Sequence, residues 1–151
     1  MTKANTLRMN QEEIIDKIRA FNRNYVRSIG LLERTVLNSN YSLTESHILH
    51  LINSHEKTTA TQINKTLKLD EGYLSRVIKK LISKSLLIKE QSSSDKRIFE
   101  IKLSEKGQKE FQKIDKLSSE SIRAITADLS PSEKLELASL FDRAMTLLYK
   151  D

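Results

Sequence analysis

The apolar residues between positions 11 and 37 recur three and four residues apart. They are Ile14, Ile18, Phe21, Tyr25, Ile29, Leu32 and Val36. Because an α-helix turns once every 3.6 residues, this spacing brings all of these side chains onto one face. The pattern predicts a single long amphipathic helix over residues 11–37, which the polar run at 38–40 ends.

Three short helices are expected next. Thr44 is placed to cap a helix over residues 45–53. The sequence Thr59-Ala60-Thr61-Gln62 is a capping box, in which the Thr hydroxyl and the Gln side chain satisfy each other's backbone amides. After a tight turn, Asp70 can cap a third helix over residues 71–84.

The helix predicted over 71–84 has two unlike faces. Its apolar face carries Leu74, Val77, Ile78, Leu81 and Ile82. Its opposite face carries Tyr73, Ser75, Arg76, Lys79, Lys80 and Lys84. A short helix, a tight turn and a second helix with a basic outer face form the helix-turn-helix pattern.

A β-hairpin and two longer helices complete the predicted order. Residues 86–91 and 98–103 alternate in the manner of short strands, with a polar loop between them. Ser104 is expected to cap the next helix, and Ser130-Pro131-Ser132-Glu133 is a capping box with Pro at the first helical position. With only three Gly and one Pro in 151 residues, the sequence predicts a mostly α fold with a small β-hairpin.

The positive charge of the chain is concentrated in one window. Residues 65–109 hold twelve Lys or Arg and six Asp or Glu, which accounts for the whole net charge of +6. A concentrated positive field favours a polyanionic partner, and nucleic acid is the commonest one. The alternative is a solvated lysine-rich face.

The composition excludes several other classes. There are no cysteines, which rules out disulfides, thiolate metal sites and cysteine-based redox sensing. No apolar run approaches the roughly 20 residues that cross a bilayer, and the N-terminal stretch lacks the apolar core of a signal peptide. We therefore expect a cytoplasmic protein. We find no glycine-rich phosphate loop, nucleophile elbow or framed carboxylate pair, so we expect no enzymatic activity and no cofactor.

Three stretches together resemble the winged helix of the multiple-antibiotic-resistance regulator (MarR) family. They are LTESHILHLI (43–52), TQINKTLKLDEGYLSRVIKKLISKSLLI (61–88) and SSSDKRIFEIKLSEKG (92–107). Asp95, Arg97, Leu103, Ser104 and Gly107 match the family's D-x-R and L-[ST]-x-x-G spacing. The resemblance implies one domain over residues 1–151, with a winged helix-turn-helix at about 44–103 and N- and C-terminal dimerisation helices at about 11–37 and 104–150.

One position departs from the family pattern. Ser85 stands where the family commonly has Gly after the recognition helix. Because Ser adopts left-handed backbone less readily than Gly, we expect the end of this helix to differ locally.

The predicted DNA-binding residues on the recognition helix are small or polar in its first half and basic in its second. Arg76 has a planar fork that matches guanine O6 and N7, and Tyr73 can stack on a sugar or touch a thymine methyl group. The later lysines are expected to meet phosphates. Arg76 paired with Glu71 or Asp70 in an exposed salt bridge is the alternative. The predicted residues are Gly72, Tyr73, Ser75, Arg76, Lys79, Lys80 and Lys84.

The hairpin tip supplies a second set of contacts. The resemblance implies that Arg97 enters the minor groove, with Asp95 orienting it or tightening the turn. Ser92–Ser94 and Lys96 are expected to hydrogen-bond to phosphates. A solvent-exposed hairpin with a local Asp–Arg pair is the alternative.

The flanking helices carry broad apolar stripes that a central unit of about 60 residues is too small to cover. They can pack on each other or on a second copy, and we favour a symmetric dimer, which suits two DNA half-sites one turn apart. The resemblance also implies a small aromatic or lipophilic acid as effector, in a cleft near Tyr25, Ile29, His47 and Phe111. Tyr25, Ile29 and Phe111 are equally consistent with plain core, which we prefer.

His47 and His50 lie three residues apart with Glu45 nearby, but without cysteines or a third well-placed histidine we expect no metal site. The leading hypothesis is a ligand-responsive transcriptional regulator, most often a repressor in this family, that binds double-stranded DNA as a homodimer. The alternative is a winged-helix module that docks a protein or RNA partner.

Overall fold

The computed structural model describes residues 9–31 and 36–149. The chain is largely helical and has one small sheet. The elements are α1 (Gln11–Ser28), η2 (Val36–Asn38), α2 (Leu43–Ser54), β1 (Lys57–Thr58), α3 (Ala60–Leu67), α4 (Glu71–Ser83), β2 (Leu87–Gln91), β3 (Phe99–Leu103), α5 (Glu105–Ile125) and α6 (Pro131–Leu148).

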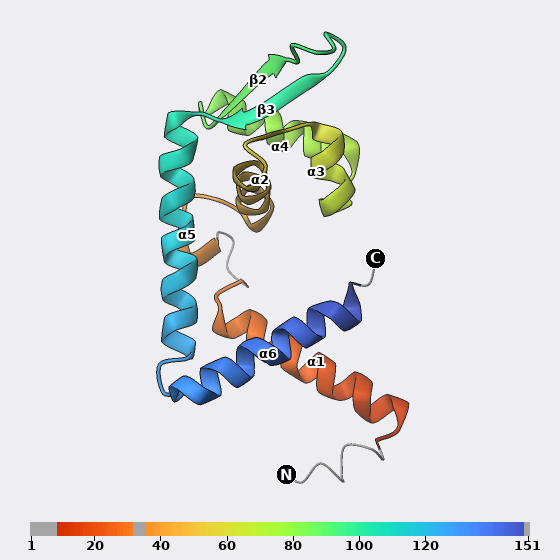
Figure 1. Cartoon of the computed structure of the whole chain (residues 1–151), viewed down its shortest axis with the longest axis vertical. Helices are drawn as coiled ribbons and strands as arrows, with labels where there is room; N and C mark the ends of the chain where they lie inside the picture. Colours follow the sequence, from red (N-terminus) through yellow and green to blue (C-terminus); the bar gives the residue numbers. More distant parts are fainter. Residues whose placement is uncertain (1–8, 32–35, 150–151) are drawn as a thin grey trace.

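The molecule has two regions joined by one long helix (Figure 1). Helices α2, α3 and α4 and the sheet lie together at one end, and we call residues 43–103 the winged-helix unit. Helices α1 and α6, which we call the flanking pair, cross each other at the opposite end. Helix α5 runs from the winged-helix unit to the flanking pair, so the chain's first and last helices meet far from its central segment.

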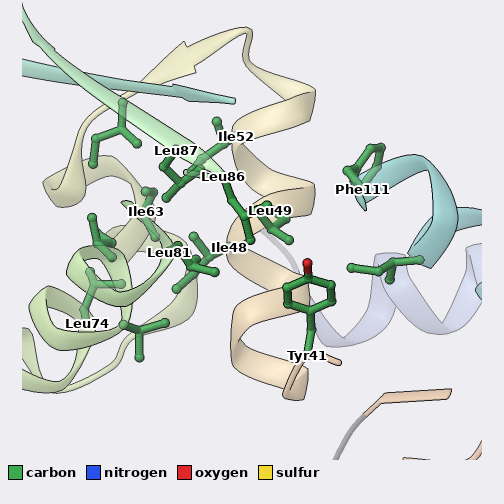
Figure 2. Packing of buried hydrophobic residues seen from close by; sticks show 14 residues of the cluster. Tyr41, Ile48, Leu49, Ile52, Ile63, Leu74, Leu81, Leu86, Leu87 and Phe111 are labelled. Atoms are coloured by element: carbon green, nitrogen blue, oxygen red, sulfur yellow. The ribbon is translucent and has the colours of Figure 1, made fainter. Parts of the chain in front are cut away.

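The hydrophobic core lies inside the winged-helix unit, against the first half of α5. Figure 2 shows side chains from α2, α3, α4 and the sheet converging there, with Phe111 approaching from α5. Tyr41 closes one edge of the cluster and is itself buried. The side chains with the least exposure are Ile48, Leu49, Ile52, Ile63, Leu81, Leu86 and Ile101.

The sheet has three antiparallel strands in the order β1-β3-β2. Strands β2 and β3 pair from Leu87 with Leu103 at the base to Gln91 with Phe99 near the loop. The two predicted strands are thus confirmed to within one residue. Strand β1 was not predicted, because two residues paired with Ile101 and Lys102 are too short to show an alternating pattern.

The first helix is shorter than predicted. Helix α1 ends at Ser28, Ile29 caps it, and Gly30 follows with a φ of 72°. This left-handed backbone suits glycine and stops the helix, so a single helix over 11–37 is wrong. The predicted stripe position Leu32 lies outside the described residues.

The cap of α2 also differs from the prediction. Ser42, not Thr44, is the N-cap, because its hydroxyl accepts from the Glu45 backbone N–H while the Glu45 carboxylate accepts from the Ser42 N–H. This is a complete capping box, and its Ser-x-x-Glu spacing was present in the sequence. The capping boxes predicted at Thr59 and Ser130 are confirmed, as is the Asp70 cap.

The end of α4 keeps the ordinary geometry despite Ser85. Ser85 has a φ of 60°. Its N–H donates to the Ile82 carbonyl at 2.8 Å, and the Leu86 N–H donates to the Leu81 carbonyl at 3.0 Å. These two bonds make a Schellman motif, the usual helix end with a left-handed residue. The expected local difference is therefore not found, and a serine holds the strained position.

Gly107 has a steric reason for being glycine. It lies in the first turn of α5, where Ser104 caps the helix by accepting the Gly107 N–H at 2.9 Å. A Cβ at this position would overlap the backbone carbonyl of Leu86. The Ser-x-x-Gly spacing therefore allows α5 to begin directly against the segment that joins α4 to β2.

Candidate nucleic-acid interface

The outer face of α4 is exposed over its first half, as predicted. Asp70 caps the helix by accepting the Tyr73 N–H at 2.8 Å, and Gly72, Tyr73, Ser75 and Arg76 all face solvent. Gly72 has no side chain, so the backbone is exposed at this point of the surface. A Cβ there would lie 3.2 Å from the Asp70 carboxylate. A helix with this profile lets its backbone come close to base edges.

Arg76 is held by an aromatic ring rather than by a carboxylate. Its guanidinium carbon lies 6.0 Å from the centre of the Tyr73 ring, within cation–π range. Among the described residues, no ion pair joins Arg76 to Asp70 or Glu71. The hydrogen-bonding fork of Arg76 therefore stays available to an incoming partner.

A basic groove runs between α3, α4 and the sheet. It has a volume of about 600 Å³. Leu74, Ile78 and Ile101 form its apolar floor, and Ser75 and Lys79 border it from α4. Lys65 from α3 and Lys89 from β2 border it as well. These two lysines were not among the predicted site residues, although both lie in the basic window of the sequence.

Lys80 is exposed, as predicted, but it is already paired within the protein. Its ammonium lies 2.7 Å from the carboxylate of Glu45 on α2, whose side chain is only 4% exposed. Burial raises the pKa of the Glu45 carboxyl, but the contacts from Lys80 and the Ser42 backbone outweigh it and leave this pKa below its usual value. Lys80 is thus engaged within the protein.

The half-buried side chain of Lys84 lies against Tyr41. Its ammonium lies 5.5 Å from the centre of the Tyr41 ring. Burial, followed by the hydrogen bond to Glu110, raises the pKa of Tyr41 to about 12, and its hydroxyl donates to Glu110 on α5 at 2.9 Å. Of the three predicted phosphate-binding lysines on α4, this geometry leaves Lys79 facing the groove.

The hairpin tip presents an arginine with a fixed orientation. The Asp95 carboxylate accepts from the Arg97 backbone N–H at 2.9 Å and from its guanidinium at 3.2 and 3.3 Å. The backbone contact and then the guanidinium lower the pKa of Asp95. The Arg97 side chain is nevertheless 91% exposed. Asp95 therefore both tightens the turn and orients Arg97.

The serines of the loop have different environments. Ser92 is buried, and its hydroxyl lies 3.0 Å from that of Ser94, so it is not available to a phosphate as expected. Ser94 and Lys96 are exposed. The Lys96 carbonyl accepts from the Gln91 side chain at 3.2 Å, which steadies the loop and leaves the Lys96 ammonium in solvent.

All four residues predicted for an effector cleft line one cavity of about 270 Å³. Tyr25 and Ile29 reach it from α1, His47 from α2 and Phe111 from α5. Burial and then the neighbouring His50 lower the pKa of His47, which favours the neutral ring. The cavity therefore combines apolar walls with hydrogen-bonding groups, and Phe111 is at the same time part of the hydrophobic core.

Two further properties concern the described residues alone. Across residues 9–31 and 36–149, no group of three or more His, Asp or Glu is arranged to hold a metal ion. Within the same ranges, no helix combines the length and the apolar character needed to cross a bilayer.

A helix-turn-helix with an exposed basic face, beside a hairpin that presents an oriented arginine, defines a winged-helix nucleic-acid-binding protein. The model of the MarR family matches residues 41–99. The HTH-type transcriptional regulator YkoM of Bacillus subtilis, itself uncharacterised, is 31% identical over 104 residues, which span 69% of this chain and 68% of YkoM. The chain belongs to the MarR family.

Other relatives agree with this assignment. The HTH-type transcriptional regulator BilQ of Clostridium symbiosum is 30% identical over 77 residues, which span 51% of this chain and 54% of BilQ. A mutant of E. coli MarR complexed with operator DNA has the same fold, with a TM-score of 0.69, 22% identity and coverage of 91% and 99%. BpsR of Bordetella bronchiseptica, whose DNA binding is regulated by 6-hydroxynicotinic acid, gives a TM-score of 0.66 at 16% identity and covers 85% and 98%.

Proposed function

We propose that this protein is a cytoplasmic, ligand-responsive transcriptional repressor that binds a palindromic double-stranded DNA site as a homodimer. Helix α4 enters the major groove and the β2–β3 hairpin reaches the adjacent minor groove. The domain then comprises a winged helix at about 44–103, with the remaining helices forming the dimer.

The observation that carries the proposal is the pairing of two cationic elements at the same end of the molecule. Helix α4 and the hairpin both lie there (Figure 1), and the basic groove has walls from α3, α4 and β2. Tyr73 and Asp95 orient Arg76 and Arg97 respectively. Two guanidinium nitrogens of Arg97 donate to Asp95, but its side chain is 91% exposed, so the remaining donors can reach a partner. Pre-orientation reduces the conformational entropy lost on binding.

The flanking pair supports the dimer. Helices α1 and α6 touch through Phe21, Tyr25 and Phe141, whose ring centres lie 5.3 to 6.2 Å apart. This contact leaves much apolar surface uncovered, and neither helix has a buried residue. Exposed apolar surface of this extent marks an association site. A second copy is the occupant that also explains a two-fold DNA site.

The cavity near Tyr25, His47 and Phe111 supports a response to a small molecule. Its walls come from α1, α2 and α5, so a ligand there contacts both the flanking pair and the winged-helix unit. An aromatic acid suits its mixture of apolar walls with histidine and serine side chains. BpsR, of the same fold, is regulated by such an acid.

The experiment that tests the proposal is selection of bound duplexes from a random pool, with measurement of the size of the complex. We expect an enriched palindrome whose half-sites lie about one helical turn apart, bound by two chains. No enrichment would favour the alternative function, a winged helix that docks a protein or RNA. The exposed face of α4 argues against a protein partner, because such interfaces centre on aromatic or aliphatic anchors.

The role of the hairpin is tested by Arg97→Ala. We expect a large loss of affinity for the selected duplex and little change in melting temperature, since Arg97 is 91% exposed. Arg19→Ala is the matched control, because Arg19 also pairs locally with an aspartate, Asp16, but lies on α1. Equal affinities for the two variants would remove the hairpin from the mechanism.

The electrostatic part of the proposal is tested by salt. Binding should weaken steeply as salt rises, because each lysine or arginine that meets a phosphate releases condensed counterions. A flat response between about 50 and 200 mM salt would contradict a phosphate-dominated interface.

A further inference from the structure

We infer that Glu45 is a positioning residue for DNA binding: it withholds Lys80 from the DNA phosphates and uses it to hold α4 against α2. The inference rests on the proposed function. It assigns the two lysines in the middle of the recognition helix, Lys79 and Lys80, to different tasks.

One oxygen of the Glu45 carboxylate accepts a hydrogen bond, and the other makes an ion pair. One accepts from the Ser42 backbone N–H at 2.8 Å and completes the N-terminal cap of α2. The other lies 2.7 Å from the Lys80 ammonium. Because the first bond fixes the carboxylate rigidly to the start of α2, the second transmits that position to the middle of α4.

The two side chains of the pair are buried to different extents, and this difference favours Lys80 remaining with Glu45. The Glu45 side chain is 4% exposed, whereas that of Lys80 is 58% exposed. If Lys80 moved to a phosphate, a buried carboxylate would lose its nearest cation, and such a loss costs far more than one solvent-exposed ion pair returns. The lysine therefore remains with Glu45 when DNA is present.

The groups around Glu45 do not replace Lys80. Lys84 is the other nearby cation, but its ammonium lies over the Tyr41 ring. The Tyr41 hydroxyl is engaged with Glu110 on α5. Glu45 thus has one close cationic partner, and that partner belongs to the recognition helix.

The placement of Glu45 also connects α4 with the effector cavity. Glu45 lies on α2 directly before Ser46 and His47, and both of these line the cavity together with His50. A ligand that shifts α2 would move the Glu45 carboxylate and, through Lys80, the middle of α4. The ion pair is therefore a direct mechanical link between the cavity wall and the recognition helix.

The first test compares the salt dependence of duplex binding in three single variants and one double variant. Glu45→Gln removes the charge but keeps the cap, since a Gln oxygen still accepts from the Ser42 N–H. Because log K falls as log salt rises, we expect Lys79→Gln to make this slope less negative by about 0.9, and Lys80→Gln to leave it unchanged. Glu45→Gln releases Lys80 and makes the slope more negative, and Glu45→Gln with Lys80→Gln restores the wild-type value.

The second readout is the ratio of specific to non-specific affinity, measured at a temperature where every variant is folded. We expect Glu45→Gln and Lys80→Gln each to lower this ratio by about tenfold, and the double variant to lower it no further, because both remove the same contact. A residue that only stabilises the fold would lower the melting temperature and leave this ratio unchanged.

Two outcomes would overturn the inference. In the first, Lys80→Gln weakens the salt dependence of binding as much as Lys79→Gln does, which would show that Lys80 reaches a phosphate. In the second, the ratio does not change in Glu45→Gln. If the wild-type protein selects no duplex, the proposed function fails instead, and a double-mutant cycle in thermal unfolding still decides whether the pair joins α2 to α4.

Discussion

The winged-helix unit and the flanking pair are both built from helices with apolar side chains, yet they differ in what covers those side chains. Leu81 on α4 is fully buried, whereas Leu148 on α6 is 70% exposed. In the winged-helix unit, three helices and a sheet close around one cluster (Figure 2). In the flanking pair, two crossing helices cover each other at three aromatic rings. One region closes its core within a single chain, and the other leaves most of its apolar faces uncovered.

The two regions should respond differently to mutation, one through folding and the other through association of two chains. An apolar side chain contributes to stability when its surface leaves water, whichever chain covers it. Core positions should therefore affect the free energy of unfolding directly. Apolar positions of α1 and α6 should act through the dimer.

The largest effect is expected from charge placed in the flanking pair. Ile18→Asp and Leu148→Asp each put a carboxylate on an apolar face that is 61% or 70% exposed in the single chain. Burying that charge in a dimer is costly, so we expect the dissociation constant of the dimer to rise by at least about a hundredfold. Sedimentation or size-exclusion with light scattering measures it.

Ile88→Asp is the matched control, since Ile88 is 37% exposed but lies on β2 in the winged-helix unit. It should leave the dimer intact. If Ile18→Asp and Leu148→Asp also leave it intact, the flanking pair is not the dimer interface.

The next prediction uses the monomeric Ile18→Asp background. There, Leu81→Ala should lower the free energy of unfolding by about 2–5 kcal/mol, because it opens a cavity in a closed core. Leu148→Ala should change it by less than about 0.5 kcal/mol, as for a surface position. Denaturant titration measures both. A large loss from Leu148→Ala in the monomer would mean that α6 is already covered within one chain.

A smaller effect is expected where the two regions are joined. Gly107→Ala at the start of α5 forces the helix away from the Leu86 carbonyl, and we expect a loss of about 1–3 kcal/mol. Gly72→Ala is the control, because a Cβ there meets only side-chain atoms, at 3.2 and 3.6 Å. Thermal unfolding of both variants checks the difference, and equal losses would contradict the steric argument.

The sequence predicted the elements whose signals are local. Periodic apolar spacing and capping residues located α3, α4, the hairpin and α6 to within one or two residues. The same signals could not show that the helix begun at Gln11 ends at Ser28, because the apolar spacing continues past Gly30. Basic residue types located the end of the molecule that we propose binds DNA. They could not show that Lys80 turns to Glu45, since that pairing joins residues 35 positions apart and depends on the packing of α2 against α4.

The smallest effect is expected at Ser85, a position of strained backbone in the winged-helix unit. Ser85 holds the left-handed residue of the Schellman motif with a φ of 60° and an exposed side chain, so Ser85→Gly should stabilise the protein by about 1 kcal/mol. Ser83→Gly, two residues earlier and still helical, should instead destabilise it by roughly 0.5 kcal/mol, because glycine is the poorer helix former. Opposite shifts in the midpoint of denaturant unfolding would establish that backbone conformation, and not the loss of a serine side chain, sets the sign. A loss of stability in both variants would mean that the left-handed backbone at Ser85 is not strained.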